Sequence, residues 1–150
     1  MMTVLVDLNV ALDFFLNRSP WATEAAGVMQ VHKDQLIRVS ISAAGLPTLF
    51  YVMRRQASRD RAFQAIDECL QTLHIVDVDR GTAVQARSFG GKDFEDDLQI
   101  ACAVGAGLEV IVSRDRAGFA HSPIPVLSPT ELLERLSAQR PPSSLPPVQG

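Results

Sequence analysis

Short apolar runs rich in β-branched residues alternate along this chain with longer segments of helical periodicity. Short runs bounded by turn residues predict buried strands, whereas apolar residues repeated about every three or four positions predict helices. We expect strands at residues 3–6, 37–41, 74–78, 109–113 and 125–127. We expect helices at residues 9–16, 21–32, 43–55, 59–73, 79–87 and 94–106, and another beginning at residues 128–131. This alternation predicts an α/β fold, in which a parallel sheet is covered by helices on both faces.

Acidic residues stand where two of these strands end and where one helix begins. Asp7 follows the first strand, and Asp115 follows the strand at residues 109–113. Four of the five residues from Asp93 to Asp97 are acidic, directly before an apolar helical run. Ligands of parallel sheets bind beyond the carboxyl ends of the strands, so we expect these acids at one edge. Carboxylates gathered there are typical ligands of Mg²⁺ or Mn²⁺, and the sequence therefore predicts a metal site.

Helix capping is the alternative interpretation for two of these acids. Asp7 precedes a helix and is placed to cap it, with Asn9 as a competing cap. Asp93 and Asp96 have the spacing of an N-cap and an acid in the first helical turn. On a helix these two also share a face, where a pair of carboxylates is able to hold one hard cation. Both interpretations remain open for Asp93.

Asp115 lies between two arginines, Arg114 and Arg116. One interpretation is a surface cluster of salt bridges, each contributing about 0–1 kcal/mol. The other makes Asp115 a metal ligand and the two arginines contacts to phosphate groups. A second basic cluster, formed by four arginines at residues 54–61, surrounds a predicted helix junction and is either a solvated face or a further phosphate-binding patch.

The overall charge and hydropathy exclude some classes of protein. The formal net charge of -3 argues against nonspecific coating of nucleic acid, although it is compatible with a local basic patch. No apolar run approaches the roughly 18 residues of a membrane span, and no basic stretch precedes the first apolar segment. We expect a cytoplasmic protein in which Cys69 and Cys102 are buried free thiols. Residues 1–139 are expected to form one domain, and the Pro- and Ser-rich residues 140–150 a disordered tail.

Other chemistries lack their motifs in this chain. The three histidines are scattered, and there is no C-x-x-C pair, no GxxxxGK[ST] phosphate loop and no G-x-S-x-G. A phosphoacceptor receiver domain also places acids at strand ends, but it needs a Lys near the last strand. The only lysines, Lys33 and Lys92, do not lie at predicted strand ends. The acidic residues therefore remain the strongest functional signal.

Four sequence blocks together resemble the PIN-domain family, whose bacterial members are mostly VapC-type toxins. The blocks are residues 4–13, 41–55 and 93–101, and residues 111–115 with Phe119 followed by residues 125–129. They stand in the family's order and span roughly residues 3–137. The resemblance implies a three-layer α/β/α fold with a central parallel sheet of strand order 3-2-1-4-5.

The resemblance also implies a catalytic site and partners. The acids expected to bind Mg²⁺ or Mn²⁺ and to cleave RNA are Asp7, Asp96 and Asp115, with Asp93 as a further metal ligand. Ser113 stands where a Ser or Thr usually lines the site, and Asn9 matches a polar residue beside the first acid. The family further implies an antitoxin protein that blocks the site, and a homodimer.

Two positions depart from the family pattern. Thr48 stands where many members have a Glu, and Gly118 stands where a later Asp is common. Thr48 supplies no negative charge, so one metal ligand is missing. The sequence leaves two hypotheses. The acidic residues favour a metal-dependent endoribonuclease, whereas Thr48 favours a PIN-like RNA-binding or protein-interaction module with weak or no catalysis.

Overall fold

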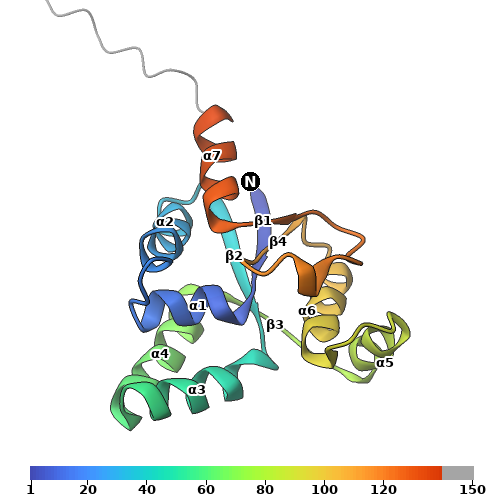
Figure 1. The fold of residues 1–150 in the computed structure, drawn as a ribbon, viewed down its shortest axis with the longest axis horizontal. Coiled ribbons are helices and arrows are strands. Elements are labelled where there is room, and N and C mark those ends of the chain that lie inside the picture. The colour runs from blue at the N-terminus through green and yellow to red at the C-terminus, as the bar shows by residue number, and fades with distance from the viewer. Residues whose placement is uncertain (140–150) are drawn as a thin grey trace, which may run out of the picture.

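The computed structural model describes residues 1–139, which contain five strands in one sheet (Figure 1). The strands are β1 (Met2–Val6), β2 (Ile37–Ser42), β3 (His74–Val76), β4 (Val110–Val112) and β5 (Val126–Leu127). The α-helices are α1 (Leu8–Phe15), α2 (Ala22–Lys33), α3 (Gly45–Gln56), α4 (Arg59–Thr72), α5 (Arg80–Ser88), α6 (Phe94–Gly105) and α7 (Pro129–Gln139). A short 3-10 helix, η1 (Ala117–Phe119), follows β4. The tail predicted at residues 140–150 lies outside the described residues.

All five strands run parallel, in the order β3-β2-β1-β4-β5. The central strand is β1, in which Leu5 pairs with Ser40 of β2 and with Ile111 of β4. The pairing continues one residue beyond β1, because the Asp7 N–H donates to the Val112 carbonyl at 2.8 Å. This confirms the strand order that the resemblance implied, and it places the carboxyl ends of β1 and β4 side by side.

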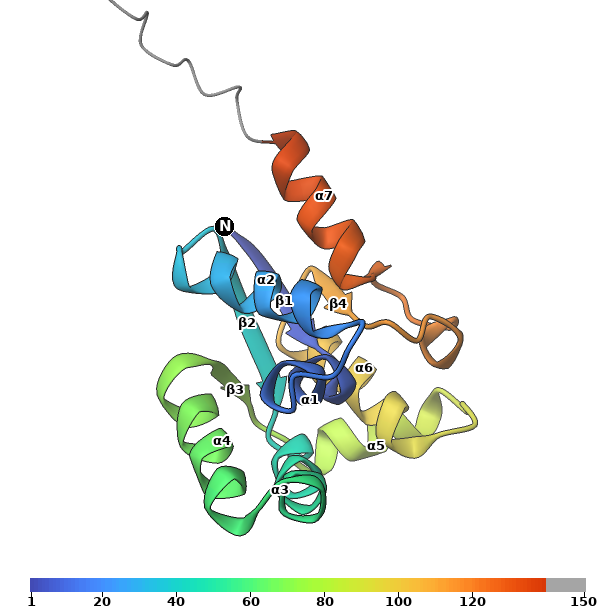
Figure 2. The same cartoon turned by 60° about the vertical axis from the view of Figure 1, so that its left-hand side comes forward.

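Side chains alternate between the two faces of the sheet, and each face has its own apolar core. Val4 and Val6 of β1 belong to the larger core, which also contains side chains from α1, α2, α3, α4 and α7. Leu5 points to the opposite face and packs in a second core with Ile100 of α6 and Phe119 of η1. Figures 1 and 2 show α1 and α2 on one side of the sheet and α6 on the other. The predicted three-layer α/β/α fold is confirmed.

Most predicted elements are found, with small shifts at their ends. Ser58 caps α4 as its position suggests, accepting a hydrogen bond from the Arg61 N–H. Ser42 does not cap the third helix. That helix begins at Gly45, and the Ser42 hydroxyl instead accepts from the Ala44 N–H at 3.2 Å, within the turn that leaves β2. The helix η1 is not predicted from the sequence, because three residues are too few to show a period.

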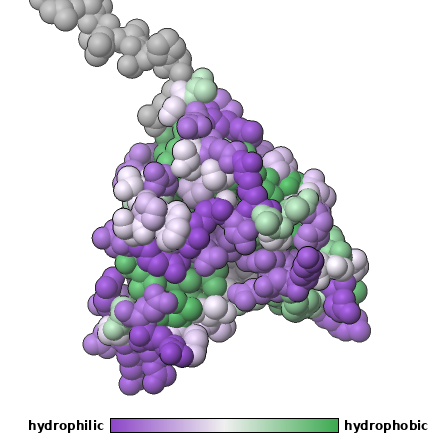
Figure 3. All heavy atoms as spheres, in the orientation of Figure 1, coloured by the Kyte–Doolittle hydropathy of each residue, from purple (hydrophilic) through white to green (hydrophobic). Residues whose placement is uncertain are grey.

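Hydrophilic residues cover most of the face drawn in Figure 3, while apolar atoms gather between α1 and the hairpin formed by α3 and α4. Phe14, Phe15 and Met53 help to line a hollow of about 230 Å³ there, which we call the α1–α3 hollow.

Within residues 1–139, no helix has both the length and the apolar composition that crossing a membrane requires.

Candidate active site at the carboxyl edge of the sheet

Asp7 lies between β1 and α1 and is almost fully buried, with 4% of its surface exposed. Its Oδ1 accepts a hydrogen bond from the Gln99 amide at 3.1 Å, and its Oδ2 accepts one from the Ser113 hydroxyl at 2.8 Å. A buried carboxylate requires such donors, since an unpaired buried charge is strongly unfavourable. Asp7 makes no side-chain cap to α1, so the capping interpretation is wrong for this residue. Its carboxylate faces α6 and β4 instead.

Ser113 connects the ends of β1 and β4. Its hydroxyl is fully buried, donates to Asp7 and accepts a hydrogen bond from the Asp115 N–H at 3.0 Å. The acid that ends β1 and the acid that follows β4 are therefore held by one side chain. The family resemblance indicated Ser113 at this edge of the sheet, and its role in a catalytic site stays a prediction.

Asp96 lies in the first turn of α6 and is partly buried. Its pKa is raised to about 6, first by partial burial and then by the negative charges of Asp93, Asp7 and Asp115. The pKa of the neighbouring Glu95 is raised by burial and by two of the same charges. No hydrogen bond from residues 1–139 offsets these effects on Asp96. A partly buried carboxylate among other carboxylates is unfavourable unless a cation joins them.

Gly118 of η1 forms the wall beside Asp96 and Asp115. A Cβ atom added to Gly118 would lie 2.7 Å from Asp96 Oδ2 and 3.3 Å from Asp115 Oδ2. The two carboxylate oxygens thus approach one point from different elements, α6 and the segment after β4. The absence of a side chain at residue 118 leaves this point open, which gives a physical reason for the Gly at this position.

The donor set fits a small divalent cation that keeps part of its water shell. Among residues 1–139, no three His, Cys, Asp or Glu side chains lie close enough together to form a complete metal cage. Mg²⁺ does not require such a cage, because it is usually held by one or two carboxylates, waters and substrate phosphates. Asp96 and Asp115, which approach the open point beside Gly118, are the pair best placed for this role.

Asp93 is the N-cap of α6, as one of the two interpretations required. Its Oδ1 accepts hydrogen bonds from the N–H groups of Glu95 at 2.9 Å and Asp96 at 3.2 Å. The charge of Asp93 nevertheless lies near enough to raise the pKa of Asp96. A metal-binding role for Asp93 stays a prediction.

Gln99, rather than Asn9, supplies the polar side chain that contacts Asp7. Asn9 is exposed on α1, and its backbone carbonyl accepts a hydrogen bond from Arg18 at 3.3 Å. The polar side chain beside Asp7 is that of Gln99, which the sequence analysis missed. Gln99 lies three residues after Asp96 on α6, so the helical period was the signal that could have identified it.

Both arginines that flank Asp115 contact other side chains. The Arg114 Nε donates to Asp13 Oδ2 at 2.8 Å, and its guanidinium lies 3.9 Å from the centre of the Trp21 ring. Arg116 forms an ion pair with Glu131 of α7. Arg114 is held by a buried carboxylate and an aromatic ring, whereas Arg116 is exposed and its partner is partly exposed. Their contact with RNA stays a prediction, and Arg116 is the more available of the two.

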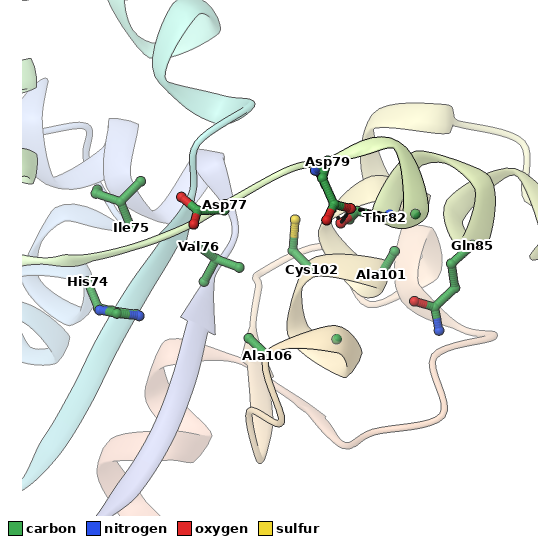
Figure 4. Close-up of a pocket in the computed structure, with 12 residues that line it drawn as sticks. His74, Ile75, Val76, Asp77, Asp79, Thr82, Gln85, Ala101, Cys102 and Ala106 are labelled. Carbon is green, nitrogen blue, oxygen red and sulfur yellow. Dashed lines mark hydrogen bonds between the residues drawn. The ribbon is translucent and has the colours of Figure 1, made fainter.

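A separate hollow of about 530 Å³ lies beside β3, between that strand and helices α5 and α6 (Figure 4). We call it the Cys102 hollow. Burial raises the pKa of the Cys102 thiol, so this sulfur is protonated at neutral pH and is a poor nucleophile. Asp79 in the same hollow caps α5, and hydrogen bonds from Thr82 lower its pKa. The three predicted catalytic acids do not line this hollow, and Cys69 and Cys102 are buried free thiols as expected.

A protein-family model described as "PIN domain" matches residues 3–117 of the chain. This match covers all three candidate acids and the strands β1 to β4. No curated protein sequence matches the chain.

Several solved structures share this fold at low sequence identity. The DNA-bound VapBC from Salmonella typhimurium contains a chain with a TM-score of 0.69 and 17% identity, over 86% of this chain and 99% of that chain. A chain of VapBC2 from Rickettsia felis, bound to a DNA fragment from its promoter, gives a TM-score of 0.67 and 14% identity, over 85% and 98%. VapC20 from Mycobacterium tuberculosis is described as a sarcin-ricin loop cleaving toxin. It matches with a TM-score of 0.66 and 15% identity, over 78% of this chain and 93% of that chain.

Proposed function

Because the chain belongs to the PIN-domain family, we propose that it is a divalent-metal-dependent endoribonuclease, a VapC-like toxin whose catalytic acids are Asp7, Asp96 and Asp115. One observation carries this proposal. Acids from the end of β1, the start of α6 and the segment after β4 lie close together around the partly buried Asp96, whose pKa is raised to about 6, first by burial and then by these charges. A function that binds a cation gives a reason for this unfavourable arrangement.

The metal ion and the chain would contribute different parts of the chemistry. When bound, Mg²⁺ or Mn²⁺ supplies Lewis-acid polarisation of the scissile phosphodiester and lowers the pKa of a water molecule. Ser113 and Gln99 hold Asp7 in one orientation through its two oxygens. Asp96 and Asp115, whose carboxylates approach one point beside Gly118, would hold the ion. With a pKa of about 6, Asp96 becomes a full negative charge only above that pH, so metal binding should strengthen as pH rises through 6.

A binding module without catalysis is the second candidate, and Thr48 is the observation that favours it. Thr48 lies in the first turn of α3 and is partly buried, and a hydroxyl cannot replace the charge of a Glu. The similar VapC20 is described as a sarcin-ricin loop cleaving toxin, which supports the nuclease for a chain of this fold. The two candidates differ in one measurable property, metal-dependent cleavage.

We propose an antitoxin protein as the partner, because two of the similar structures are VapBC complexes. The α3–α4 hairpin exposes three large apolar side chains, Tyr51, Phe63 and Leu70. Together with the α1–α3 hollow they make an apolar surface of the kind that marks protein interfaces.

Light scattering tests the expected homodimer separately. A mass of 16.3 kDa for the purified chain in solution would refute it.

The test of catalysis is cleavage of a mixed tRNA and rRNA pool in Mn²⁺ or Mg²⁺ by the wild-type chain and by Asp96→Asn. Asp60→Asn is the matched control, because Asp60 is also an acid in the first turn of a helix, α4, and is exposed. We expect wild type and Asp60→Asn to cleave RNA and Asp96→Asn to be inactive. Folded wild-type protein that cleaves nothing would favour the binding module, and full activity in Asp96→Asn would refute the assigned site.

A further inference from the structure

A hollow of about 550 Å³ adjoins the acidic residues on the side of α5. It is within the range of about 300–1,000 Å³ that is usual for ligand sites. We call it the Lys92 hollow. Its lining residues are Phe89, Gly90, Gly91, Lys92, Asp93, Asp96, Ala117, Gly118 and His121. Because Asp93, Asp96 and Gly118 belong both to this hollow and to the candidate active site, anything bound in it lies next to the reacting position.

One buried carboxylate fixes the two rims of the Lys92 hollow. Asp97 is 3% exposed, and its Oδ2 accepts a hydrogen bond from the Gly91 N–H at 3.0 Å. Its Oδ1 contacts His121 Nε2 at 2.7 Å. The loop between α5 and α6 and the loop after η1 are therefore tied to the same side chain of α6. The hollow is preformed, and a ligand would bind without first ordering these loops.

Two glycines that line the Lys92 hollow lie against carboxylates. A Cβ atom added to Gly91 would lie 2.3 Å and 2.6 Å from the carboxylate oxygens of Asp97, so any other residue would displace the buried acid. A Cβ atom added to Gly118 would lie 2.7 Å from Asp96 Oδ2 and would occupy the passage between the hollow and the acids. Both positions thus require the residue without a side chain.

The lining of the Lys92 hollow combines aromatic rings with one positive charge. The rings of Phe89 and His121 lie with their centres 6.2 Å apart at an angle of 65°. Phe89 is partly buried against the second apolar core, which fixes its ring. Lys92 is exposed and forms no ion pair with any acid of residues 1–139. Aromatic side chains stack on unpaired bases, and free ammonium groups bind phosphates.

We propose that the Lys92 hollow is the subsite for one nucleotide of single-stranded RNA next to the scissile phosphate. Its base lies against Phe89 and His121, and a neighbouring phosphate pairs with Lys92. This inference rests on the proposed ribonuclease function and specifies the part of the substrate, one unpaired nucleotide, that the hollow binds. A paired base is hidden inside a duplex, so the subsite selects single-stranded loops over helices.

Binding measurements on a pair of lysine variants test this subsite. Lys92→Gln and Lys33→Gln remove the same charge, and these are the only lysines of the chain. Lys33 ends α2 just before β2 begins, at the amino edge of the sheet and away from the acids. The probe is a fluorescent single-stranded oligoribonucleotide of mixed sequence, measured by anisotropy in EDTA, where metal-dependent cleavage cannot occur.

We expect Lys92→Gln to weaken binding several-fold and to reduce the slope of log Kd against log salt by about 0.7, the value for one phosphate contact on a single strand. We expect Lys33→Gln to change neither quantity. Equal effects of the two variants, with wild type binding the probe, would overturn the subsite. This outcome is distinct from failure of the proposed function, in which wild-type protein cleaves no RNA.

Ultraviolet crosslinking places the base independently of any variant. Trypsin releases residues 88–92 as one peptide, which contains Phe89, and residues 19–33 as another, which contains Trp21. We expect the bound oligoribonucleotide to crosslink to the peptide of residues 88–92. Crosslinking confined to residues 19–33 would place the base beside Trp21 and would overturn the proposal. A duplex RNA of the same sequence is the control and is expected to give no crosslink in residues 88–92.

Discussion

Neutralising Asp96 should stabilise the metal-free protein even as it removes the proposed activity. In wild type, the Asp96 carboxylate is partly buried near four other acids, and no hydrogen bond from the described residues offsets their repulsion. Asn has nearly the same shape but no charge. The substitution Asp96→Asn therefore removes the repulsion and leaves the packing of α6 unchanged.

The size of this effect follows from the pKa of Asp96. Its value is raised from 3.8 to about 6 in the folded chain. A difference of this size corresponds to about 3 kcal/mol if it is fully expressed. Because Asp96 still contacts solvent, screening reduces the expected gain to about 1 kcal/mol. The folded state binds the proton more tightly than the unfolded state. The penalty in wild type is thus complete above pH 6 and disappears as the pH falls toward 3.8.

Urea denaturation in EDTA at several pH values measures this difference. We expect Asp96→Asn to be more stable than wild type above pH 6 and the two proteins to converge as the pH approaches 3.8. The control Asp60→Asn is not expected to be stabilised, because a helix N-terminus favours the negative charge of its exposed acid. A lower stability of Asp96→Asn at high pH, or a gain that does not depend on pH, would refute the reasoning.

Two further predictions concern residues that support the site. Ser113→Ala removes the donor to buried Asp7 Oδ2 and should lower the free energy of unfolding by about 1–3 kcal/mol, which urea denaturation measures. An unchanged stability would show that Ser113 does not hold Asp7. Arg114→Ala removes the cation over Trp21, the only tryptophan, and one partner of buried Asp13, so both tryptophan fluorescence and stability should change. A wild-type emission spectrum in this variant would contradict the observed stacking.

The elements and the position of the acids could be predicted from local sequence patterns. Short apolar runs rich in β-branched residues predicted the strands, and the carboxyl ends of parallel strands lie at a common edge. Asp7 and Asp115 were therefore expected at the same edge of the sheet, and in the structure both form hydrogen bonds with Ser113. The strand order needed the family resemblance, because periodicity does not determine which strands are neighbours.

Local sequence patterns could not predict the contacts that decide the role of each polar residue. An Asp that precedes a helix has the same sequence pattern whether it caps the helix or binds a metal ion. Only the fold shows that the Asp7 side chain does not cap α1, whereas the Asp93 side chain caps α6. Asp97 stands in the same acidic run, yet it is a buried support for two loops. Its partner His121 lies 24 residues away, and no local spacing predicts that contact.

Binding of Mn²⁺ tests most directly whether these acids form one cation site. Electron paramagnetic resonance of free Mn²⁺ gives the bound fraction without any RNA substrate, for wild type, Asp96→Asn and Asp60→Asn. We expect wild type and Asp60→Asn to bind Mn²⁺ at a saturable site. We expect Asp96→Asn to bind Mn²⁺ at least tenfold more weakly, because loss of a ligand carboxylate should cost more affinity than the roughly tenfold effect of losing a supporting residue. Equal Mn²⁺ affinity in Asp96→Asn and wild type would contradict the proposed site.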